Sequence, residues 1–455
     1  MDGPSPLACR RFRESSPTVR ILFVSLYAEP QLVGGNNNVF RQAKSVCEIP
    51  GAAVEILTWP LECEREGLCY RVVGLPKTWQ DRILTDSEWD AAVALGVCLL
   101  QQIQPTIVHL QHWRGLWWIL EAAQRLSIPT VYSVHDWGMV CLRTILVTGE
   151  GALCDGRVDA QKCAACVWKG RSCLGKFNES FVSCRAGEMV MEFLFRTRAC
   201  DFLLSRGALR AGLRSRIDRN VERARRILGR LDALIVANSF AGDFFSQFGV
   251  AKDDTHVLPW YYDGPPVSEQ RARRTDEGIT LGYIGRISPE KGLHLLIQAI
   301  LQMQATGPIR LVIAGAVDNP YAEQLCRRHP DRIGEHRVEW LGWMPHGDVS
   351  KFYSRVDVVV IPSLWMDNTP LTLIESCHYH RPVIAVDIPP TRDLVRNGVN
   401  GYLFPFGDAR ALAQIVREMA ANPDLVARLS RKIPGVLSAQ EYGTKLVEVY
   451  RSLVE

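Results

Sequence analysis

The sequence predicts an α/β protein made of two doubly wound domains. Short apolar runs of the kind that form buried parallel strands alternate with helix-compatible segments in both halves of the chain. At 455 residues, the chain is too long for one ordinary hydrophobic core. Its 47% of apolar and 22% of charged residues are typical of a folded protein. We therefore expect two parallel sheets, each with helices on both faces.

The first domain is expected at residues 19–258, after a polar, proline-containing tail at residues 1–18. Its predicted strands lie at residues 19–26, 53–58, 106–110, 129–134 and from 233 onward, with helices at 39–46, 88–102 and 115–126. The strand that begins at Ala233 is interpreted as the last one of this domain.

An insertion at about residues 139–230 interrupts this alternation. Cys163 and Cys166 have the spacing of half a zinc knuckle, because two intervening residues let both thiolates reach one tetrahedral ion. The preferred partners are Cys141 and Cys154, and the substitutes are Cys173 and Cys184. A small structural zinc site is one interpretation, and disulfides or plain buried thiols are the alternative.

The second part of the insertion, residues 206–231, is predicted to be helical. Apolar residues recur at steps of three and four between Leu209 and Leu231, and nine arginines lie between residues 206 and 230. Such a face is either a solvated cover of the first domain or a surface for anionic lipid headgroups or an anionic acceptor. Peripheral membrane contact through this helix is therefore one hypothesis.

A linker rich in proline and charge is expected at residues 259–277, followed by a second domain at residues 278–435. The predicted strands of that domain begin at Ile279 and lie at 309–314, near Val338, at 356–361, at 382–386 and, as a short apolar turn, at 401–404. Residues 436–455 are predicted to form a helix that packs back on the first domain.

Two acidic residues, Asp367 and Glu375, lie between two apolar runs of the second domain, with seven residues separating them. Asp367 is in a turn-rich loop and Glu375 is in the helix-compatible sequence that follows, so both fall near one helix N-terminus. Backbone N–H groups and the helix dipole favour an anion there. Two carboxylates beside an anion suit a sugar bound to a diphosphate. A helix cap and a surface ion pair are the plainer alternative.

Two cations precede this acidic pair. Gly285 and Arg286 follow the first strand of the second domain, and Lys291 stands just before the next predicted helix. Gly285 allows close approach of the backbone, and the arginine and lysine suit the oxygens of a diphosphate. The alternative is a loop that holds only salt bridges.

Two features of the first domain also point to a ligand. Gly34 and Gly35 follow the first strand, where a glycine pair lets the backbone approach a phosphate or a sugar, although an ordinary turn is equally compatible. His135 stands at the carboxyl end of a predicted strand, where ligands collect in doubly wound sheets. A packing histidine is the alternative. Four tryptophans could form a stacking wall or belong to the core: Trp113, Trp117, Trp118 and Trp137.

The residues of the second domain resemble those of the retaining GT-B glycosyltransferases of family 4. The resemblance rests on Gly285-Arg286, on Lys291-Gly292, and on the acidic pair, where the family usually has two glutamates and this chain has Asp367 first. A subgroup of the family is similar in a His-Asp-aromatic segment followed by a cysteine and a Cys-x2-Cys loop. The resemblance covers most of the chain outside the tail and the insertion.

The resemblance implies two Rossmann-like domains that face a central cleft. It also implies transfer of a hexose from a nucleoside diphosphate sugar to an acceptor hydroxyl, with retention of the anomeric configuration. Arg286 and Lys291 would neutralise the departing diphosphate, Glu375 would accept the ribose hydroxyls, and Asp367 would hold the donor sugar. The other implied contacts are made by His135 with the sugar, by Gly34 and Gly35 over the phosphates, and by the backbone near Thr369 and Leu371. No catalytic divalent metal is implied.

Composition limits the other functions. The net charge of +4 is small for this length, so no nucleic-acid partner is expected. The phosphate-binding motifs of ATPases and of nicotinamide enzymes are absent from the sequence. No apolar run reaches 18 residues and no signal-peptide arrangement opens the sequence, so a cytoplasmic protein is expected. The alternatives are a non-catalytic sugar-nucleotide-binding subunit, an inverting transferase or an epimerase. The donor base and the acceptor (a saccharide, a lipid-linked or a small molecule) stay open.

Overall fold

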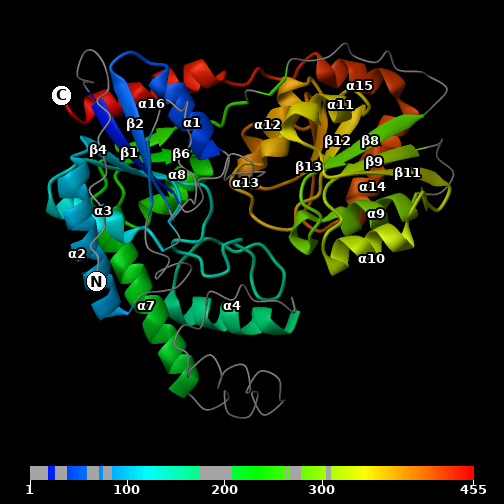
Figure 1. Ribbon diagram of the computed structural model, residues 1–455. Helices are drawn as coiled ribbons and strands as arrows, with labels where there is room; N and C mark the ends of the chain where they lie inside the picture. Colours follow the sequence, from blue (N-terminus) through cyan, green and yellow to red (C-terminus); the bar gives the residue numbers. More distant parts are fainter. Residues whose placement is uncertain are drawn as a thin grey trace.

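The computed structural model describes residues 19–25, 38–58, 71–74, 85–113, 115–173, 208–262, 264–265, 278–303 and 309–455. Two lobes lie side by side, and each is centred on a sheet of predominantly parallel strands (Figure 1). The predicted α/β fold with two parallel sheets is therefore confirmed.

The described part of the first lobe contains a parallel sheet with the strand order β3-β2-β1-β4-β5-β6-β7. The strands are β1 (Val19–Ser25), β2 (Ala52–Thr58), β3 (Arg71–Gly74), β4 (Ile107–Leu110), β5 (Thr130–Ser133), β6 (Ala233–Val236) and β7 (Thr255–Val257). The helices are α1 (Asn38–Cys47), α2 (Asp86–Ile103), α3 (Trp118–Arg125), α4 (Ala160–Cys173), α7 (Ala208–Leu228) and α8 (Ser239–Ser246). The strand order reverses at β1, and in such sheets ligands bind outside the carboxyl ends of the strands at the reversal.

The prediction that the strand from Ala233 ends this sheet is wrong. Residues Thr255–Val257 form β7, which pairs in parallel with β6 at the edge of the sheet. Three partly exposed residues are too few to give a recognisable apolar pattern, and the same holds for the four-residue β3.

The described second lobe contains a sheet with the order β10-β11-β9-β8-β12-β13-β14, in which only the β10–β11 pair is antiparallel. The strands are β8 (Ile279–Ile284), β9 (Ile309–Ala314), β10 (Arg332–Ile333), β11 (His336–Gly342), β12 (Val358–Ile361), β13 (Val383–Val386) and β14 (Gly401–Phe404). The helices are α9 (Leu293–Leu301), α10 (Pro320–Arg328), α11 (Val349–Tyr353), α12 (Leu371–His378), α13 (Pro389–Arg392), α14 (Ala409–Ala421) and α15 (Pro423–Ser430), with short 3₁₀ turns at Pro289–Lys291 and His346–Asp348. The C-terminal helix α16 (Ala439–Ser452) follows them and lies on the first lobe.

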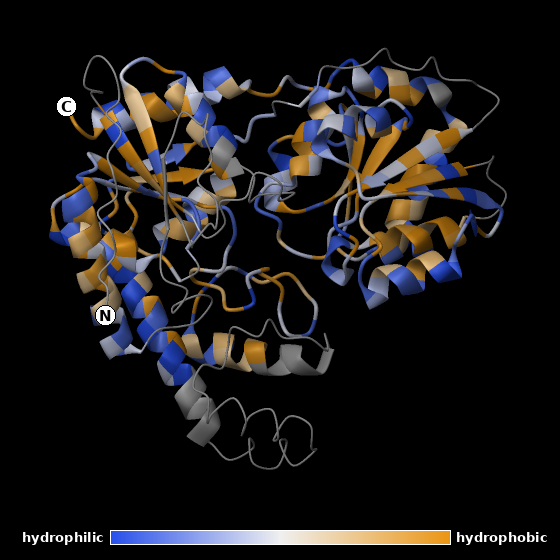
Figure 2. Ribbon diagram, viewed as in Figure 1, coloured by the Kyte–Doolittle hydropathy of each residue, from blue (hydrophilic) through white to orange (hydrophobic). Residues whose placement is uncertain are grey.

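The central strands of both sheets are buried on both faces. Strands β4, β5, β6, β12 and β13 have no exposed residue, as expected for parallel strands that are covered by helices on either side. Figure 2 shows these apolar strands between helices whose outer faces are polar. None of the described helices is long and apolar enough to cross a membrane.

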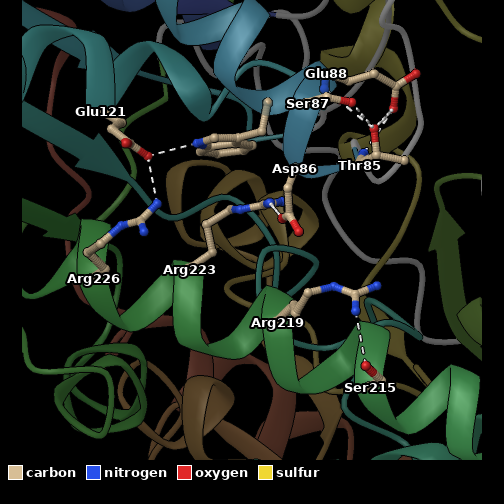
Figure 3. A network of polar contacts seen from close by, with 10 residues as sticks. Thr85, Asp86, Ser87, Glu88, Glu121, Ser215, Arg219, Arg223 and Arg226 are labelled. Carbon is tan, nitrogen blue, oxygen red and sulfur yellow. Dashed lines mark hydrogen bonds and ion pairs between the residues drawn. The ribbon is translucent and has the colours of Figure 1, made fainter.

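Helix α7 covers the first lobe with its apolar stripe, and part of its arginine-rich face is used in the same contact. Arg223 is buried, lies 4.3 Å from the ring centre of Trp89 and pairs with Asp86 at 2.6 Å (Figure 3). Arg226 pairs at 2.9 Å with Glu121, which also accepts a hydrogen bond from Trp89. These arginines therefore hold the insertion on α2 and α3.

Helix α16 packs against α1 of the first lobe, where the C-terminal end of the chain also lies (Figure 1). Tyr450 of α16 hydrogen-bonds His109 of β4 at 2.5 Å, and the other ring nitrogen of His109 is 2.8 Å from the Ser133 hydroxyl. His109 is fully buried, and burial lowers its pKa to about 3.

The buried His109 predicts a pH dependence of stability. Its pKa is lowered in the folded protein, so below about pH 6.5 only the unfolded chain takes up this proton, and stability falls as pH falls from 6.5 toward 3. His109→Gln should reduce this slope by about 1.4 kcal/mol per pH unit. Denaturant unfolding between pH 4.5 and 7.5 measures how the free energy of unfolding depends on pH. Ser133→Ala is the control, since it removes a hydrogen bond but leaves the titrating ring. An unchanged slope in His109→Gln would contradict the assignment.

Candidate functional site

The carboxyl ends of β8 and β12 bring the predicted cation and acid together. Lys291 Nζ lies 2.9 Å from the Asp367 carboxylate, whose side chain is only 9% exposed. The lysine also lies 4.7 Å from the ring centre of Trp365. Arg286, by contrast, is largely exposed and pairs with Glu290 at 2.8 Å. The ion pair of Lys291 is therefore largely buried, whereas that of Arg286 is largely exposed.

A glycine stands next to each of the two cations, Gly285 before Arg286 and Gly292 after Lys291. Gly285 has φ 143°, and a Cβ atom added there would meet no atom within 4 Å. Gly292 has φ 72°, and a Cβ atom there would lie 1.9 Å from the Pro362 carbonyl oxygen, so only glycine fits after Lys291. The N-termini of α9 and α12 lack side-chain caps. Their first N–H groups therefore favour an anion at this edge of the sheet.

Two further donors lie in the same loops. The Ser288 hydroxyl and the Trp365 Nε1 are buried and have no hydrogen-bond partner within the described residues. Buried polar atoms are rarely left without a partner, so unpaired donors beside Lys291 indicate a place for a ligand with acceptor oxygens.

Glu375 lies on α12 and accepts a hydrogen bond of 2.9 Å from the Tyr353 hydroxyl. Burial raises the pKa of Glu375 to about 7, although the Tyr353 hydrogen bond and the positive charge of Arg41 lower it. Arg41 belongs to α1 of the first domain, so the two domains meet electrostatically at this carboxyl group. The group changes its charge near neutral pH.

The loop that carries Asp367 is bound directly by the first domain. Asn238, which caps α8, donates hydrogen bonds to the backbone carbonyl and the side-chain oxygen of Asn368 and to the Thr369 hydroxyl. Asn368 in turn donates to the Val134 carbonyl at 2.6 Å, directly before His135. Asn238, Asn368 and Thr369 are all buried. We call these hydrogen bonds the interdomain clasp.

The insertion extends the same contact. The buried indole of Trp137 donates to the Met366 carbonyl at 2.6 Å, and the Met366 amide donates to the Ile145 carbonyl at 2.9 Å. Trp117, Trp118 and Trp137 are buried in the core and only Trp113 is partly exposed, so these tryptophans do not form the stacking wall that was one of the two interpretations.

His135 is packed between two aromatic rings. It stacks on His112 with ring centroids 5.2 Å apart and on Trp260 with ring centroids 5.0 Å apart. Its Nε2 is 2.8 Å from Gln111 Oε1. Burial, and then the neighbouring histidines, lower its pKa well below the usual value, so the ring is neutral at pH 7. A ligand would meet the edge of this ring rather than its face.

The four candidate zinc ligands line one cavity of about 250 Å³ in the insertion: Cys141, Cys154, Cys163 and Cys166. Within the part of the chain that the structure describes, no group of three or more His, Cys, Asp or Glu side chains is arranged to hold a metal ion, and the zinc site stays a prediction. Burial among apolar residues raises the pKa of Cys141 to about 11 and also raises that of Cys163. In the absence of a metal ion, both groups are therefore neutral thiols at pH 7.

The structure brings Lys291 to Asp367 and sets Thr369 and Leu371 at the start of α12, while Gly34, Gly35 and Cys184 lie outside the described residues. Tyr353, Trp365 and Asn238 were not singled out as site residues from the sequence. Asn238 follows a strand end and reads as a cap, which was a usable signal. Tyr353 gave none, because its partner is 22 positions away along the chain.

Comparison with known proteins agrees with this fold. The sequence profile of the family described as Glycosyl transferases group 1 matches residues 267–435. An uncharacterized glycosyltransferase of Methanocaldococcus jannaschii is 28% identical over 186 residues, which are 38% of this chain and 46% of that protein. The alpha-D-kanosaminyltransferase of Streptomyces kanamyceticus is 28% identical over 184 residues, 39% and 46% of the two chains. The matched region spans about half the length of these curated relatives.

Solved structures match nearly the whole chain. Sucrose-phosphate synthase from Thermosynechococcus elongatus has a TM-score of 0.64 at 17% identity, with 96% of this chain and 99% of that chain covered. HepE of Anabaena, in complex with UDP and glucose, has a TM-score of 0.57 at 17% identity, with 96% and 98% covered. At such identities the similarity shows the fold alone: two parallel-sheet domains arranged as in GT-B glycosyltransferases.

The interdomain clasp predicts that the donor-side loop loosens when Asn368 is lost. Asn368→Ala removes the hydrogen bond to Val134 and one acceptor of Asn238, which should cost about 1–3 kcal/mol because buried polar groups lose their partners. The amide of Met366, bonded across the interface, should then exchange faster with deuterium, as mass spectrometry of peptides around 366–369 can measure. Ser239→Ala, which removes only a 3.4 Å contact to Asp393, is the matched control. Equal exchange in both variants would exclude the clasp.

Proposed function

We propose that the protein transfers a hexose from a nucleoside diphosphate sugar to an acceptor hydroxyl, with retention of the anomeric configuration. The observation that carries this proposal is the Lys291–Asp367 ion pair at the carboxyl edge of the second sheet, beside two helix N-termini without side-chain caps. A diphosphate needs the cation and the N–H groups, and a sugar needs the carboxylate. The structural neighbours include proteins in complex with UDP and with ADP, which agrees with such a donor.

When the donor binds, the Lys291 ammonium group would leave its ion pair with Asp367 and pair with the diphosphate instead. Arg286 is exposed and pairs, among the described residues, with Glu290; it would join Lys291 as a bidentate ligand of the phosphate oxygens. The Ser288 hydroxyl and the Trp365 indole N–H, which have no partner among the described residues, would donate hydrogen bonds to the diphosphate as well. As the bond between the sugar and the diphosphate breaks, these groups stabilise the charge that develops on the leaving group.

Asp367, released by Lys291, would accept hydroxyls of the donor sugar, and Glu375 would accept the ribose hydroxyls. The neutral ring edge of His135 and the backbone near Thr369 and Leu371 would complete the sugar and phosphate contacts. Gly34 and Gly35 would cover the phosphates from the first domain. By resemblance to family 4, the departing phosphate oxygen takes the proton of the acceptor hydroxyl on the same face of the sugar. This scheme needs no side-chain nucleophile and no divalent metal.

The domain assignment belongs to this proposal. The first domain (residues 19–258) would face the acceptor, the second (278–435) would bind the donor, and the linker (259–277) would join them. Peripheral membrane contact would use the arginines of α7 that the fold leaves exposed, such as Arg214, Arg219 and Arg225. Arg223 and Arg226 are already engaged by the first domain.

Release of nucleoside diphosphate from a panel of UDP-, GDP-, ADP- and dTDP-sugars, with chelator present, tests the proposal. We expect release from one donor, and a fall of at least about 100-fold in Lys291→Ala, because a charge on the leaving group loses its partner. Arg286→Ala, which removes only an exposed ion pair, should fall by about 10-fold or more without threatening the fold. Lys432→Ala, at an exposed position of the same domain, should match the wild type.

Three other outcomes would redirect the proposal. Donor binding without release at any acceptor would favour a non-catalytic sugar-nucleotide-binding subunit. Transfer with an inverted product anomer, read by proton NMR, would contradict retention but not transfer. Absence of both binding and release across the panel would overturn the function itself.

A further inference from the structure

Three buried tyrosines lie near Glu375 and were not assigned a role in the donor site: Tyr262, Tyr353 and Tyr379. Tyr353 is fully buried, so its hydroxyl cannot touch a ligand, yet it donates to Glu375 Oε2 at 2.9 Å. Its other hydrogen-bond partners among the described residues are the Thr372 carbonyl, at 3.4 Å, and the Ser376 side chain. Hydrophobic packing alone would be served equally well by phenylalanine. The hydroxyl therefore has a role through the carboxyl group that it contacts.

The ring of Tyr353 is held by the interdomain linker. It stacks on Tyr379 with centroids 4.5 Å apart and an angle of 16° between the planes. The Tyr379 hydroxyl donates to the Pro265 carbonyl at 2.9 Å and lies 3.3 Å from the Tyr262 hydroxyl. Tyr262 and Pro265 both belong to the linker. The ring of Tyr353 is thus held indirectly by the linker, through Tyr379.

Resting on the proposed assignment of Glu375 to the donor ribose, we propose that Tyr353 is a positioning residue of the donor site. Its hydroxyl fixes one oxygen of the Glu375 carboxylate, keeps that carboxylate ionised and leaves the other oxygen for the hydroxyls of the ligand. A carboxylate offers about four lone-pair sites on two oxygens, and Tyr353 occupies one of them, so the ring hydroxyl sets how the remaining sites are presented to the ligand.

The charge of Glu375 depends on few groups. Burial raises its pKa to about 7, and the two groups that oppose this are the Tyr353 hydroxyl on α11 and the cation of Arg41 on α1. Tyr262 of the linker and Tyr379 at the end of α12 also face the carboxylate. Burial, and to a lesser extent the charge of Glu375, raises the pKa of both phenols, so they stay neutral near pH 7. Loss of the Tyr353 hydrogen bond therefore raises the pKa of Glu375 further.

Binding of the active nucleoside diphosphate sugar, measured by calorimetry from pH 5.5 to 9 without acceptor, tests the proposal. The diphosphate of such a donor is esterified at both ends and has no ionisation near pH 7, so a midpoint reports on the protein. In the wild type, affinity should rise as pH increases through about 7, because the ligand hydroxyls need the carboxylate. In Tyr353→Phe, the midpoint should move up by about one pH unit, which weakens binding about fivefold at pH 7.

Two variants separate positioning from mere packing. Tyr379→Phe keeps the stack and removes no hydrogen bond of the Glu375 carboxylate, so its midpoint should stay at the wild-type pH. Glu375→Gln removes the titrating group, so its binding should show no midpoint, and adding Tyr353→Phe to it should shift nothing. A Tyr353→Phe midpoint equal to that of the wild type would overturn the proposal.

Failure of the proposed function gives a different pattern. If the wild type binds none of the four donors at any pH, the transferase assignment falls. The Glu375 carboxyl is then titrated directly by carbon-13 NMR in the wild type and in Tyr353→Phe. Equal pKa values of Glu375 in the two proteins would overturn the role of Tyr353 as well, and a higher value in the variant would retain it.

Discussion

The side chain of Asn368 is buried at the junction of the two domains, and its need for hydrogen-bond partners shapes the whole site. A buried amide without partners costs about 1–3 kcal/mol, so Asn368 must find a donor and an acceptor. It finds both in the first domain, in the Asn238 side chain and the Val134 carbonyl. The conformation of the neighbouring Asp367 therefore depends on how the two domains meet. Any separation of the two domains at this junction breaks the Asn238–Asn368 and Asn368–Val134 hydrogen bonds and releases the loop that carries the Asp367 carboxylate.

The Lys291–Asp367 pair imposes a second condition, on the ligand. A charge that is buried and then loses its partner costs more than the pair contributed, so a ligand that engages only one of the two groups would leave the other uncompensated. A molecule that brings phosphate oxygens to Lys291 and hydroxyls to Asp367 satisfies both at once. An anion without hydroxyls, or a neutral sugar, satisfies one. The pair thus favours the combined ligand over either of its halves, and this selectivity needs no additional contact.

The sequence predicts what is local and periodic. The fully buried strands, such as those from Val358 and Val383, were recognised because burial of both faces makes them continuous apolar runs. The short edge strand β7 was not, because three residues carry no period. Residue types at strand ends placed Lys291 and Asp367 in one site. The zinc interpretation of Cys163 and Cys166 rests on spacing and stays a prediction, although both cysteines line one cavity. Partners that depend on the meeting of the domains, as Asn238 and Asn368 do, have no signature in a single sequence.

The beginning of the linker belongs to both halves of the site. Trp260 stacks on His135 of the first domain, and two positions later Tyr262 contacts Tyr379 beside Glu375 of the second. Aromatic pairs of this kind contribute about 0.5–1.5 kcal/mol each beyond their buried area. A movement of the domains about this linker must therefore disturb the ring beside the proposed sugar position and the support of the proposed ribose position together. Because linker residues contact His135 directly and the surroundings of Glu375 through Tyr379, a displacement of the linker would change the positions of both side chains together.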